Sequence, residues 1–322
     1  MHLLAASRSG RVGPIADALR ALNAPALDAY RRLLGAGDVA RLVRDNGILY
    51  VYESEAALDA DDAGWAMRRA RGIRVERIGR DALRQLEPAL GPGIACAMLI
   101  EDSAHVVDPA GVVKTLAERF AADGGTIAAE RVAGFDLGPD GPRAVYTDAG
   151  PRDAGAVVVA AGAWSRTLAA KLGSRVPLEA ERGYHVTLPD PGVAPSRPVG
   201  FIERGFIATP MAMGLRLAGT VELASLDAPP DYRRARALLE HGRRLFPGLD
   251  GDGASEWMGC RPSLPDSLPV IGRAPGISNV YFAFGHGHLG LTQGAVTGEL
   301  IAALVAGRPP AIDLAPYRAD RF

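Results

Sequence analysis

The chain has 322 residues, of which 48% are hydrophobic and 23% are charged, and its formal net charge is -1. A chain of this size buries a substantial core, and its near-neutral charge argues against nucleic-acid binding, which needs clustered basic surface. The basic stretch at 233–244 is interpreted as the solvated face of a helix, with contact to an anionic membrane as the alternative.

The two cysteines, Cys96 and Cys260, lie in no C-x-x-C pair and beside no metal-spaced histidine. We interpret them as small buried residues in a reducing compartment. No apolar run approaches the roughly 20 residues that span a bilayer, and the N-terminal apolar stretch is too short for a secretory signal. We therefore expect a soluble, cytoplasmic chain, with peripheral attachment to the inner face of the plasma membrane left open.

The first hundred residues predict helices and short strands. Apolar residues recur at helical spacing over 14–34, and a β-rich run follows at 48–52. Ser54 and Asp81 are each expected to cap a helix. A further strand is expected at 98–100.

The middle of the chain has an α/β pattern. Asp108 and Pro109 predict a helix start, because an Asp cap followed by Pro in the first turn is a strong signal. Strands are expected at 126–132 and around 144–147. The run 156–162 shows no polar alternation, which predicts a central strand covered on both faces.

From residue 175 on, short apolar segments alternate with Gly and Pro, which predicts an antiparallel sheet. The expected strands of this sheet are 184–188, 199–203, 206–209 and 215–222. Asp231 is expected to cap a helix. The last third returns to an α/β pattern, with a strand at 280–284 and an apolar helix at 291–305 that should be buried almost all round.

Two glycine-bearing junctions are candidate ligand contacts. Gly162 ends the apolar run 156–161, where glycine permits close backbone approach, although a tight connection explains it equally well. The run 285–292 joins a strand to a helix whose N-terminal amides suit a negatively charged ligand. Turning explains its glycines but not its two histidines, His286 and His288, for which a metal site is the less favoured alternative.

Arg261 marks a third junction, in the proline-rich run 259–272. A guanidinium held stiffly in this way is suited to a carboxylate ligand. An internal salt bridge to Asp266 or another acid is an equal alternative.

In this order, the three junctions resemble the FAD-dependent family of D-amino acid oxidases, D-amino acid dehydrogenases, glycine oxidase and sarcosine oxidase. The likeness is strongest to the bacterial D-amino acid dehydrogenase-like branch and covers essentially the whole chain. It includes two strand motifs typical of that branch, which are Arg182-Gly183-Tyr184-His185 and Gly219-Thr220-Val221-Glu222.

The resemblance implies FAD as the cofactor and assigns residues to it. A backbone group of Val132 would contact the adenine, and Ala161 and Gly162 would approach the phosphate region, with Trp164 in the same turn. The residues implied along the flavin are Gly285, His286, Gly287, Gly290, Leu291 and Thr292.

For the substrate, the resemblance implies that Arg261 holds a carboxylate. His288 stands where some relatives carry a second arginine for that carboxylate. Tyr184 and His185 would lie on a strand that walls the cavity. The implied reaction of amino acid catabolism is hydride transfer to flavin N5 from a D-amino acid, or a D-hydroxyproline-like secondary amine acid, giving the imine and then the 2-oxo acid. A quinone or other electron-transfer acceptor is favoured over oxygen.

The implied architecture is mixed α/β. A discontinuous Rossmann-like FAD domain occupies 105–174 and 257–322. An antiparallel substrate domain occupies 175–256, and residues 1–104 are mostly substrate or cap domain with a helical N-terminus.

Relatives begin with a strand, a G-x-G-x-x-G turn and a helix. The N-terminal glycines at 10, 13, 35 and 37 have neither this spacing nor a preceding strand, so the FAD domain is expected to lack its first βαβ unit. Three explanations stay open. The start is misassigned or the gene fragmentary, a second chain supplies the unit, or the protein is an inactive remnant that binds a ligand or a partner.

Overall fold

The structure, a computed structural model, describes residues 2–139 and 141–322. The α-helices are α1 (His2–Ala6), α2 (Ser9–Asn23), α3 (Ala26–Leu42), α4 (Glu55–Ala60), α5 (Asp62–Arg69), α6 (Arg80–Leu86), α7 (Pro109–Ala122), α8 (Ser165–Lys171), α9 (Arg233–Leu245) and α10 (Gly290–Val305). The 3-10 helices are η1 (Gly162–Trp164), η2 (Ile202–Arg204), η3 (Gly287–Leu289) and η4 (Ala315–Tyr317).

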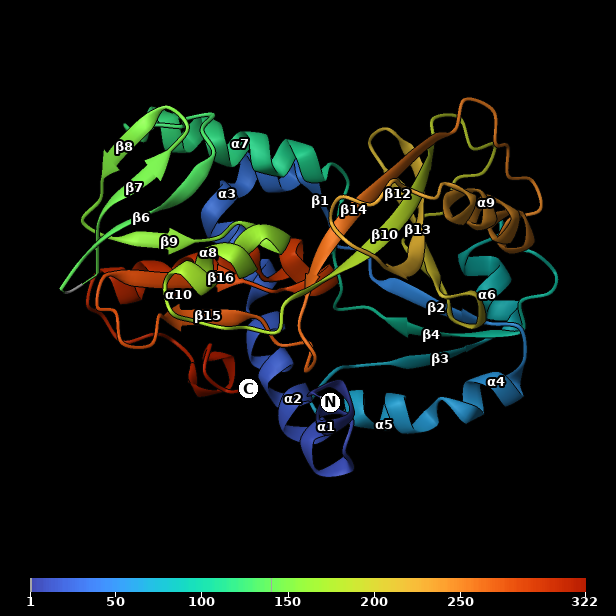
Figure 1. Cartoon of the computed structure of the whole chain (residues 1–322). Helices are drawn as coiled ribbons and strands as arrows, with labels where there is room; N and C mark the ends of the chain where they lie inside the picture. The colour runs from blue at the N-terminus through green and yellow to red at the C-terminus, as the bar shows by residue number, and fades with distance from the viewer. Residues whose placement is uncertain (1, 140) are drawn as a thin grey trace.

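The strands of the first half are β1 (Val43–Arg44), β2 (Ile48–Tyr52), β3 (Glu76–Gly79), β4 (Cys96–Ile100), β5 (His105–Val106), β6 (Val132–Gly138), β7 (Gly141–Thr147), β8 (Gly150–Asp153) and β9 (Val157–Val159). Those of the second half are β10 (Glu179–Leu188), β11 (Val199–Phe201), β12 (Phe206–Met211), β13 (Gly214–Leu223), β14 (Ser255–Ser263), β15 (Val270–Arg273) and β16 (Val280–Phe284). The expected mixed α/β fold is confirmed (Figure 1).

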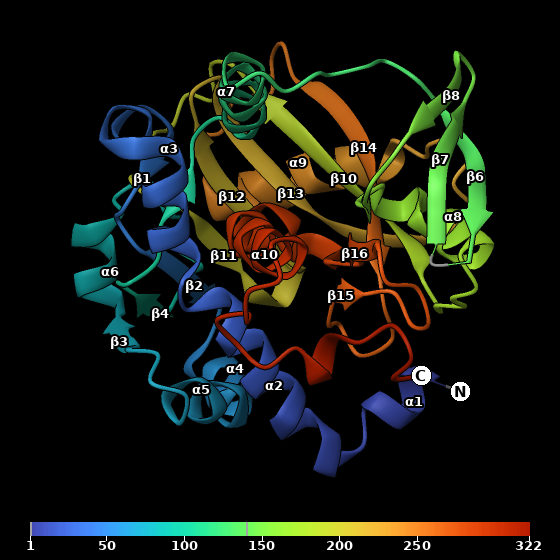
Figure 2. The same ribbon diagram turned by 90° about the vertical axis from the view of Figure 1, so that its left-hand side faces the viewer.

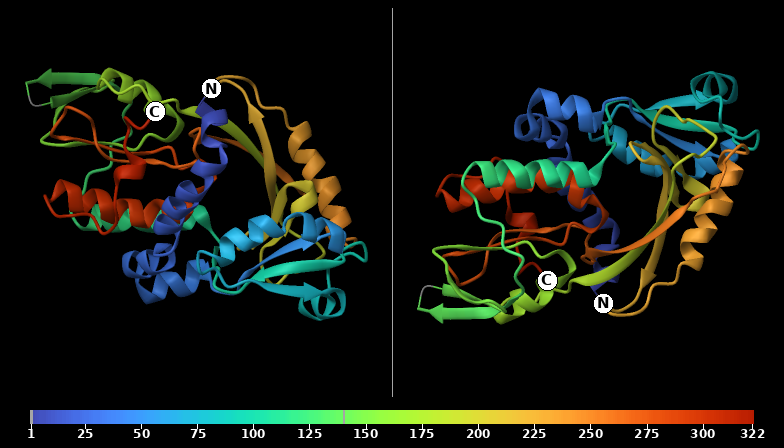
Figure 3. Two further views of the ribbon diagram at one scale, coloured as in Figure 1. Left: turned by 90° about the horizontal axis from the view of Figure 1, so that it is seen from below. Right: turned by 90° about the horizontal axis from the view of Figure 1, so that it is seen from above.

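The largest sheet has the strand order β14-β10-β13-β12-β11-β2-β4-β3. Neighbouring strands in it are antiparallel except β11 and β2, which run parallel. All four strands expected between 184 and 222 belong to it, so the predicted antiparallel sheet is present. Seen from below and above, this sheet with α9 forms one lobe, and the smaller sheets with α10 form the other (Figure 3).

The two faces of β10 have different surroundings, because successive side chains of a strand point to opposite sides. On one face Val186 and Leu188 belong to the apolar core that includes Leu238 and Phe246 of the α9 region. Each such fully buried side chain contributes about 1.5–3 kcal/mol to folding. The opposite face carries Gly183 and its alternating neighbours, and this face forms the candidate site.

Helix α9 contains the basic stretch noted in the sequence. Its arginines that are exposed to solvent are Arg233, Arg236, Arg243 and Arg244. Its apolar side chains enter the core of the large sheet. Within the described ranges, no helix is both long and apolar enough to cross a bilayer.

The expectation of a central strand at 156–162, covered on both faces, was wrong. Strand β9 spans only Val157–Val159 and pairs with β16 in parallel, in the order β15-β16-β9. Val158 is 44% exposed. The apolar run is uncovered because, among the described residues, β9 is an edge strand with a neighbour on one side only.

Helix α10 is likewise less buried than its composition predicts. It packs on α3, α2, β15 and β16 (Figure 2). The residues on its remaining side are exposed at nearly four-residue spacing: Gly290, Gly294, Gly298, Ala302 and Val305. The sequence looks apolar all round because this exposed stripe consists of small or apolar residues.

Two helix caps are confirmed by hydrogen bonds. The Ser54 hydroxyl accepts from the Ala57 amide at 3.1 Å, and the Asp108 carboxylate accepts from the Gly111 amide at 2.9 Å. Asp81 instead lies inside the first turn of α6, whose N-cap is Gly79.

Two other local predictions also differ from the structure. The helical pattern over 14–34 is two helices, α2 and α3, separated at Pro25. The residues 126–131 form no strand, and β6 starts at Val132.

Candidate active site

Arg261 lies on the open face of the large sheet. Its strand β14 pairs with β10 so that Gly183 and Gly259 face each other. The Arg261 guanidinium lies over Gly183, where an added Cβ would overlap it. Its Nη1 donates to the Thr220 carbonyl at 3.0 Å. Glycine is therefore needed at position 183 for the guanidinium to lie flat on the sheet.

The alternative salt bridge between Arg261 and Asp266 is not formed. Asp266 pairs with Arg321, whose Nε lies 2.8 Å from its Oδ2. The structure gives Arg261 no ion pair with another described residue, although the Glu181 carboxylate is near enough to act on its pKa. Burial lowers the pKa of Arg261 and Glu181 raises it. The guanidinium is thus half-buried and available for an anionic ligand.

Thr220 shows how the sheet holds this guanidinium. The β10–β13 pairing shifts at Gly183, where β13 contains an extra residue, as in a β-bulge. Thr220 lies there with a φ of 62°, a left-handed conformation that is costly for a β-branched residue. The bulge directs its carbonyl to Arg261.

Trp257 lies next to Arg261 on the same face. Its indole covers Gly259, where an added Cβ would overlap the six-membered ring. It stacks on His185, with ring centroids 4.8 Å apart and an interplanar angle of 18°. Burial, and then the charge of Arg216, lower the pKa of His185 to about 4. The stacked pair is therefore uncharged at neutral pH.

The junction between β16 and α10 contains η3, which packs against β14. Gly285 and Gly287 have φ values of 86° and 53°, which favour glycine. Gly285, Gly287 and Gly290 have the spacing of a G-x-G-x-x-G turn between a strand and a helix. The amides of the first turn of α10 have no intrahelical partners and carry the positive end of the helix dipole.

The two histidines of this turn have separate environments. The His286 ring nitrogen Nε2 lies 3.0 Å from the Thr297 hydroxyl, and burial lowers the pKa of His286 to about 4. Burial and the charge of Arg261 lower the pKa of His288, so the structure brings these two residues near each other. Within the described residues, no cluster of three His, Cys, Asp or Glu side chains could hold a metal.

A cavity of about 600 Å³ lies between the start of α10 and the large sheet. It is bordered by Leu291 and Thr292 of α10, Thr209 and Met211 of β12, and His105 of β5. Thr209 pairs with Arg216 and therefore points to the same side of the sheet as His185 and Arg261. The cavity thus adjoins the β12 part of the open face, and its lining does not include Arg261, His185 or Trp257.

The other residues singled out in the sequence lie elsewhere. Tyr184 is on the core face of β10, where its hydroxyl bonds Glu222 at 2.6 Å and accepts from the Asp231 amide at 3.0 Å. It is therefore no wall of the cavity. Val132 begins β6 in the β6-β7-β8 meander. Ala161, Gly162 and Trp164 are in the η1 region, and η1 packs against β14.

Three residues at the site were given no role there from the sequence: Trp257, Thr220 and His105. Trp257, Gly259 and Arg261 alternate along one strand, which is a signal for a shared face. The partner strand, and hence the facing glycines, could not be found from a single sequence.

Residues 4–304 match the family model described as FAD dependent oxidoreductase (DAO). The chain belongs to this family of flavin-dependent oxidoreductases. It is 37% identical to a D-amino-acid oxidase of Bradyrhizobium diazoefficiens over 100% of this chain and 77% of that protein. It is 32% identical to D-amino acid dehydrogenase 2 of Mesorhizobium japonicum over 84% of this chain and 66% of that protein.

Solved structures of the DAO family have the same fold. Glycine oxidase from Geobacillus kaustophilus superposes with a TM-score of 0.79 at 26% identity, covering 96% of this chain and 83% of that one. Iminodiacetate oxidase from Chelativorans superposes with a TM-score of 0.77 at 26% identity, covering 92% of this chain and 83% of the other.

FAD is the cofactor of the DAO family, and the residues of this chain fit its flavin end. The first turn of α10 offers free amides, and no side chain fills the space beside Gly290, where an added Cβ would meet only the His286 Cβ at 3.8 Å. A groove of about 720 Å³ runs along α10 and β9, and its lining contains no lysine or arginine.

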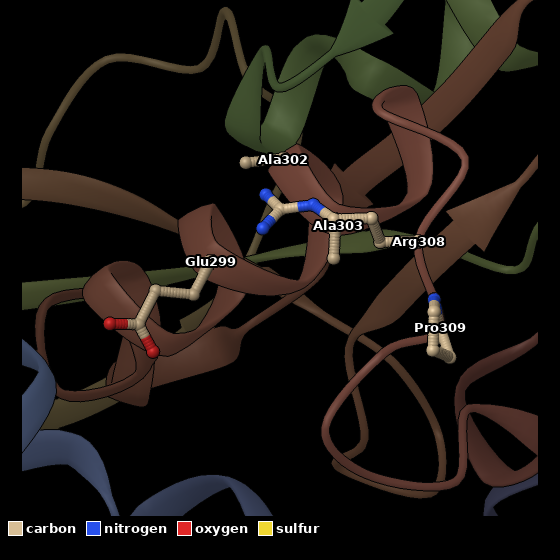
Figure 4. A pocket seen from close by; sticks show the side chains of 5 residues that line it. All are labelled: Glu299, Ala302, Ala303, Arg308 and Pro309. Carbon is tan, nitrogen blue, oxygen red and sulfur yellow. The ribbon is translucent and has the colours of Figure 1, made fainter.

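A further hollow of about 480 Å³ lies at the C-terminal end of α10 (Figure 4). The residues that line it are Glu299, Ala302, Ala303, Arg308 and Pro309. Both Glu299 oxygens accept from Arg32 at 2.9 Å, so this carboxylate is already paired. We assign no ligand to this hollow.

Proposed function

We propose that this chain binds the carboxylate of a D-amino acid, or of a related secondary amine acid, for oxidation to the imine and then the 2-oxo acid. The observation that carries the proposal is the Arg261 guanidinium, half-buried and without an ion pair to a described residue. A guanidinium fork binds a carboxylate through two parallel hydrogen bonds. Bound FAD would supply the oxidant, with flavin N5 accepting a hydride from the substrate Cα.

The roles of the protein groups follow from their positions. Arg261 would fix the carboxylate and so orient the Cα–H toward the start of α10. The free amides near Leu291 and Thr292 would stabilise negative charge that develops there. No general base is needed at Cα, since the hydrogen leaves with its electron pair. His288, close to Arg261, would border the carboxylate subsite.

The remaining cofactor contacts are also proposals. The adenine would lie near Val132, and the phosphates near Ala161, Gly162 and Trp164. The flavin would lie along Gly285, His286, Gly287 and Gly290. We further propose FAD-domain segments at 105–174 and 257–322 around a substrate domain at 175–256. Support comes from the β15-β16-β9 sheet, which is separate from the large sheet. The boundary between 256 and 257 falls inside β14, which spans 255–263 and belongs to the large sheet.

The names of the two curated relatives described above support D-amino acids as the substrate class. The chain spans 77% of the length of one of these relatives and 66% of the other. We also propose a quinone-type electron acceptor and a cytoplasmic location, with peripheral membrane contact as a variant.

A second candidate function is ligand or partner binding without catalysis. The observation that favours it is the edge of β9, which has no second partner strand among the described residues, beside the exposed small-residue stripe of α10. Edge strands and apolar faces of this kind are sites for adding a polypeptide strand. Under this hypothesis Arg261 still binds a carboxylate, but no electrons are transferred.

One experiment distinguishes these functions. The purified chain is incubated with FAD, desalted and examined for flavin absorbance, and it is then mixed with D-alanine or D-hydroxyproline and an artificial electron acceptor. Oxidation of a D-amino acid by this chain requires that flavin is retained and that the acceptor is reduced in a reaction that Arg261→Ala abolishes. Carboxylate binding that depends on Arg261, without flavin retention or acceptor reduction, supports the binding function. A faster reaction with D-hydroxyproline identifies the secondary amine as substrate.

A further inference from the structure

We propose that Trp257 is a specificity-determining residue and that the site selects amino acids with an aromatic side chain. This inference rests on the proposed function, because it takes Arg261 as the carboxylate anchor. It follows from four residues of two paired strands, Gly183 and His185 on β10, and Trp257 and Gly259 on β14.

The facing glycines bring the anchor and the indole together. Gly183 and Gly259 are register partners, and the side chains of such partners project from the same face about 5 Å apart. The guanidinium occupies the space above one glycine, and the six-membered ring of Trp257 occupies the space above the other. The guanidinium and the indole therefore lie side by side on a floor without side chains.

The indole is presented for contact and not buried as core. His185 stacks on it, yet Trp257 remains 54% exposed. An exposed tryptophan that is held by stacking loses little conformational freedom when a ligand binds. The pair His185 and Trp257, with the pKa of His185 near 4, presents a neutral aromatic wall at physiological pH.

The position of this wall defines what it contacts. A carboxylate bound to Arg261 would lie beside the indole, because the guanidinium and the ring occupy the spaces over two facing glycines. A planar ring joined to Cα through one carbon spans that separation and can pack against Trp257. A methyl side chain, as in alanine, leaves the indole uncovered. Aromatic contacts of this kind add about 0.5–1.5 kcal/mol to the stabilisation from burying the ring. Burial and aromatic contact together correspond to roughly tenfold tighter binding.

The test uses 3-phenylpropionate and propionate, which have the carbon skeletons of phenylalanine and alanine without an oxidisable amine. Binding to the full chain is measured by calorimetry with FAD in excess throughout. We expect 3-phenylpropionate to bind the wild type about tenfold more tightly than propionate. Trp257→Ala should reduce this ratio to less than threefold, and Trp257→Phe should keep most of it. Tyr146→Ala, which removes an exposed aromatic ring from the β6-β7-β8 meander, should leave the ratio unchanged.

The outcomes separate this inference from the proposed function. Arg261→Ala should weaken both probes, since both carry the carboxylate. If both probes depend on Arg261 but the ratio is the same in Trp257→Ala as in the wild type, the aromatic subsite is wrong and the carboxylate site stands. If Arg261→Ala changes neither affinity, or if neither probe binds, both proposals fail.

Discussion

Replacing Gly183 by alanine should disable the carboxylate site while leaving the sheet folded. The new Cβ would occupy the space of the Arg261 guanidinium, so that group must move off the sheet. In moving it loses the 3.0 Å hydrogen bond from Nη1 to the Thr220 carbonyl. A hydrogen bond of a charged group contributes about 1.5–3 kcal/mol, which corresponds to roughly 10- to 100-fold weaker carboxylate binding.

The assay is calorimetric binding of 3-phenylpropionate, accompanied by urea unfolding of each variant. A double-mutant cycle isolates the cause, because Gly183→Ala should have almost no effect on binding once Arg261→Ala has removed the guanidinium. Gly134→Ala in β6, where the added Cβ meets nothing within 4 Å, is the matched control. Additive losses in the cycle, or wild-type affinity in Gly183→Ala, would refute the idea that Gly183 holds the guanidinium in place.

Three further predictions concern stability. Tyr52→Phe removes the hydroxyl that accepts from the buried Trp65 Nε1 at 2.8 Å, and it should lower the free energy of unfolding by about 1–3 kcal/mol in urea titrations. Arg321→Met leaves the buried Asp266 carboxylate without its ion pair and should cost about 3–5 kcal/mol; a loss below about 1 kcal/mol contradicts the assignment. Burial lowers the pKa of His286 from 6.5 to about 4. The contribution of His286 to the free energy of unfolding is therefore full above pH 6.5 and declines as the pH falls toward 4. His286→Asn should flatten the wild-type decline of unfolding free energy across that window, and parallel curves for the two proteins argue against it.

The sequence predicted the elements whose signals are local. The Ser54 and Asp108 caps needed only a hydrogen-bonding side chain at the helix start, and both are formed. The prediction that the apolar run at 156–162 is buried on both faces was wrong, because composition indicates how hydrophobic a segment is but not which elements pack over it. Val158 is apolar yet 44% exposed, since its cover depends on strands distant in sequence.

The candidate site was predictable to the same limited degree. Arg261 is prominent in the sequence because prolines surround it. Whether it pairs with Asp266 or is free for a ligand depends on Arg321, which is 60 residues further along the chain and pairs with Asp266 in the fold. Tyr184 and His185 are adjacent in sequence and were grouped together, although alternation along β10 sends them to opposite faces. The facing of Gly183 and Gly259 is a property of register, which no single strand encodes.

That register also bears on how such a protein could evolve. The carboxylate anchor and the aromatic wall are on one strand, separated by Gly259, and each rests over a different glycine. A change at position 257 can therefore alter the shape offered to the side chain of a ligand without disturbing Arg261. New preferences would be reached through single substitutions at this position, while the requirement for an acid group is inherited unchanged.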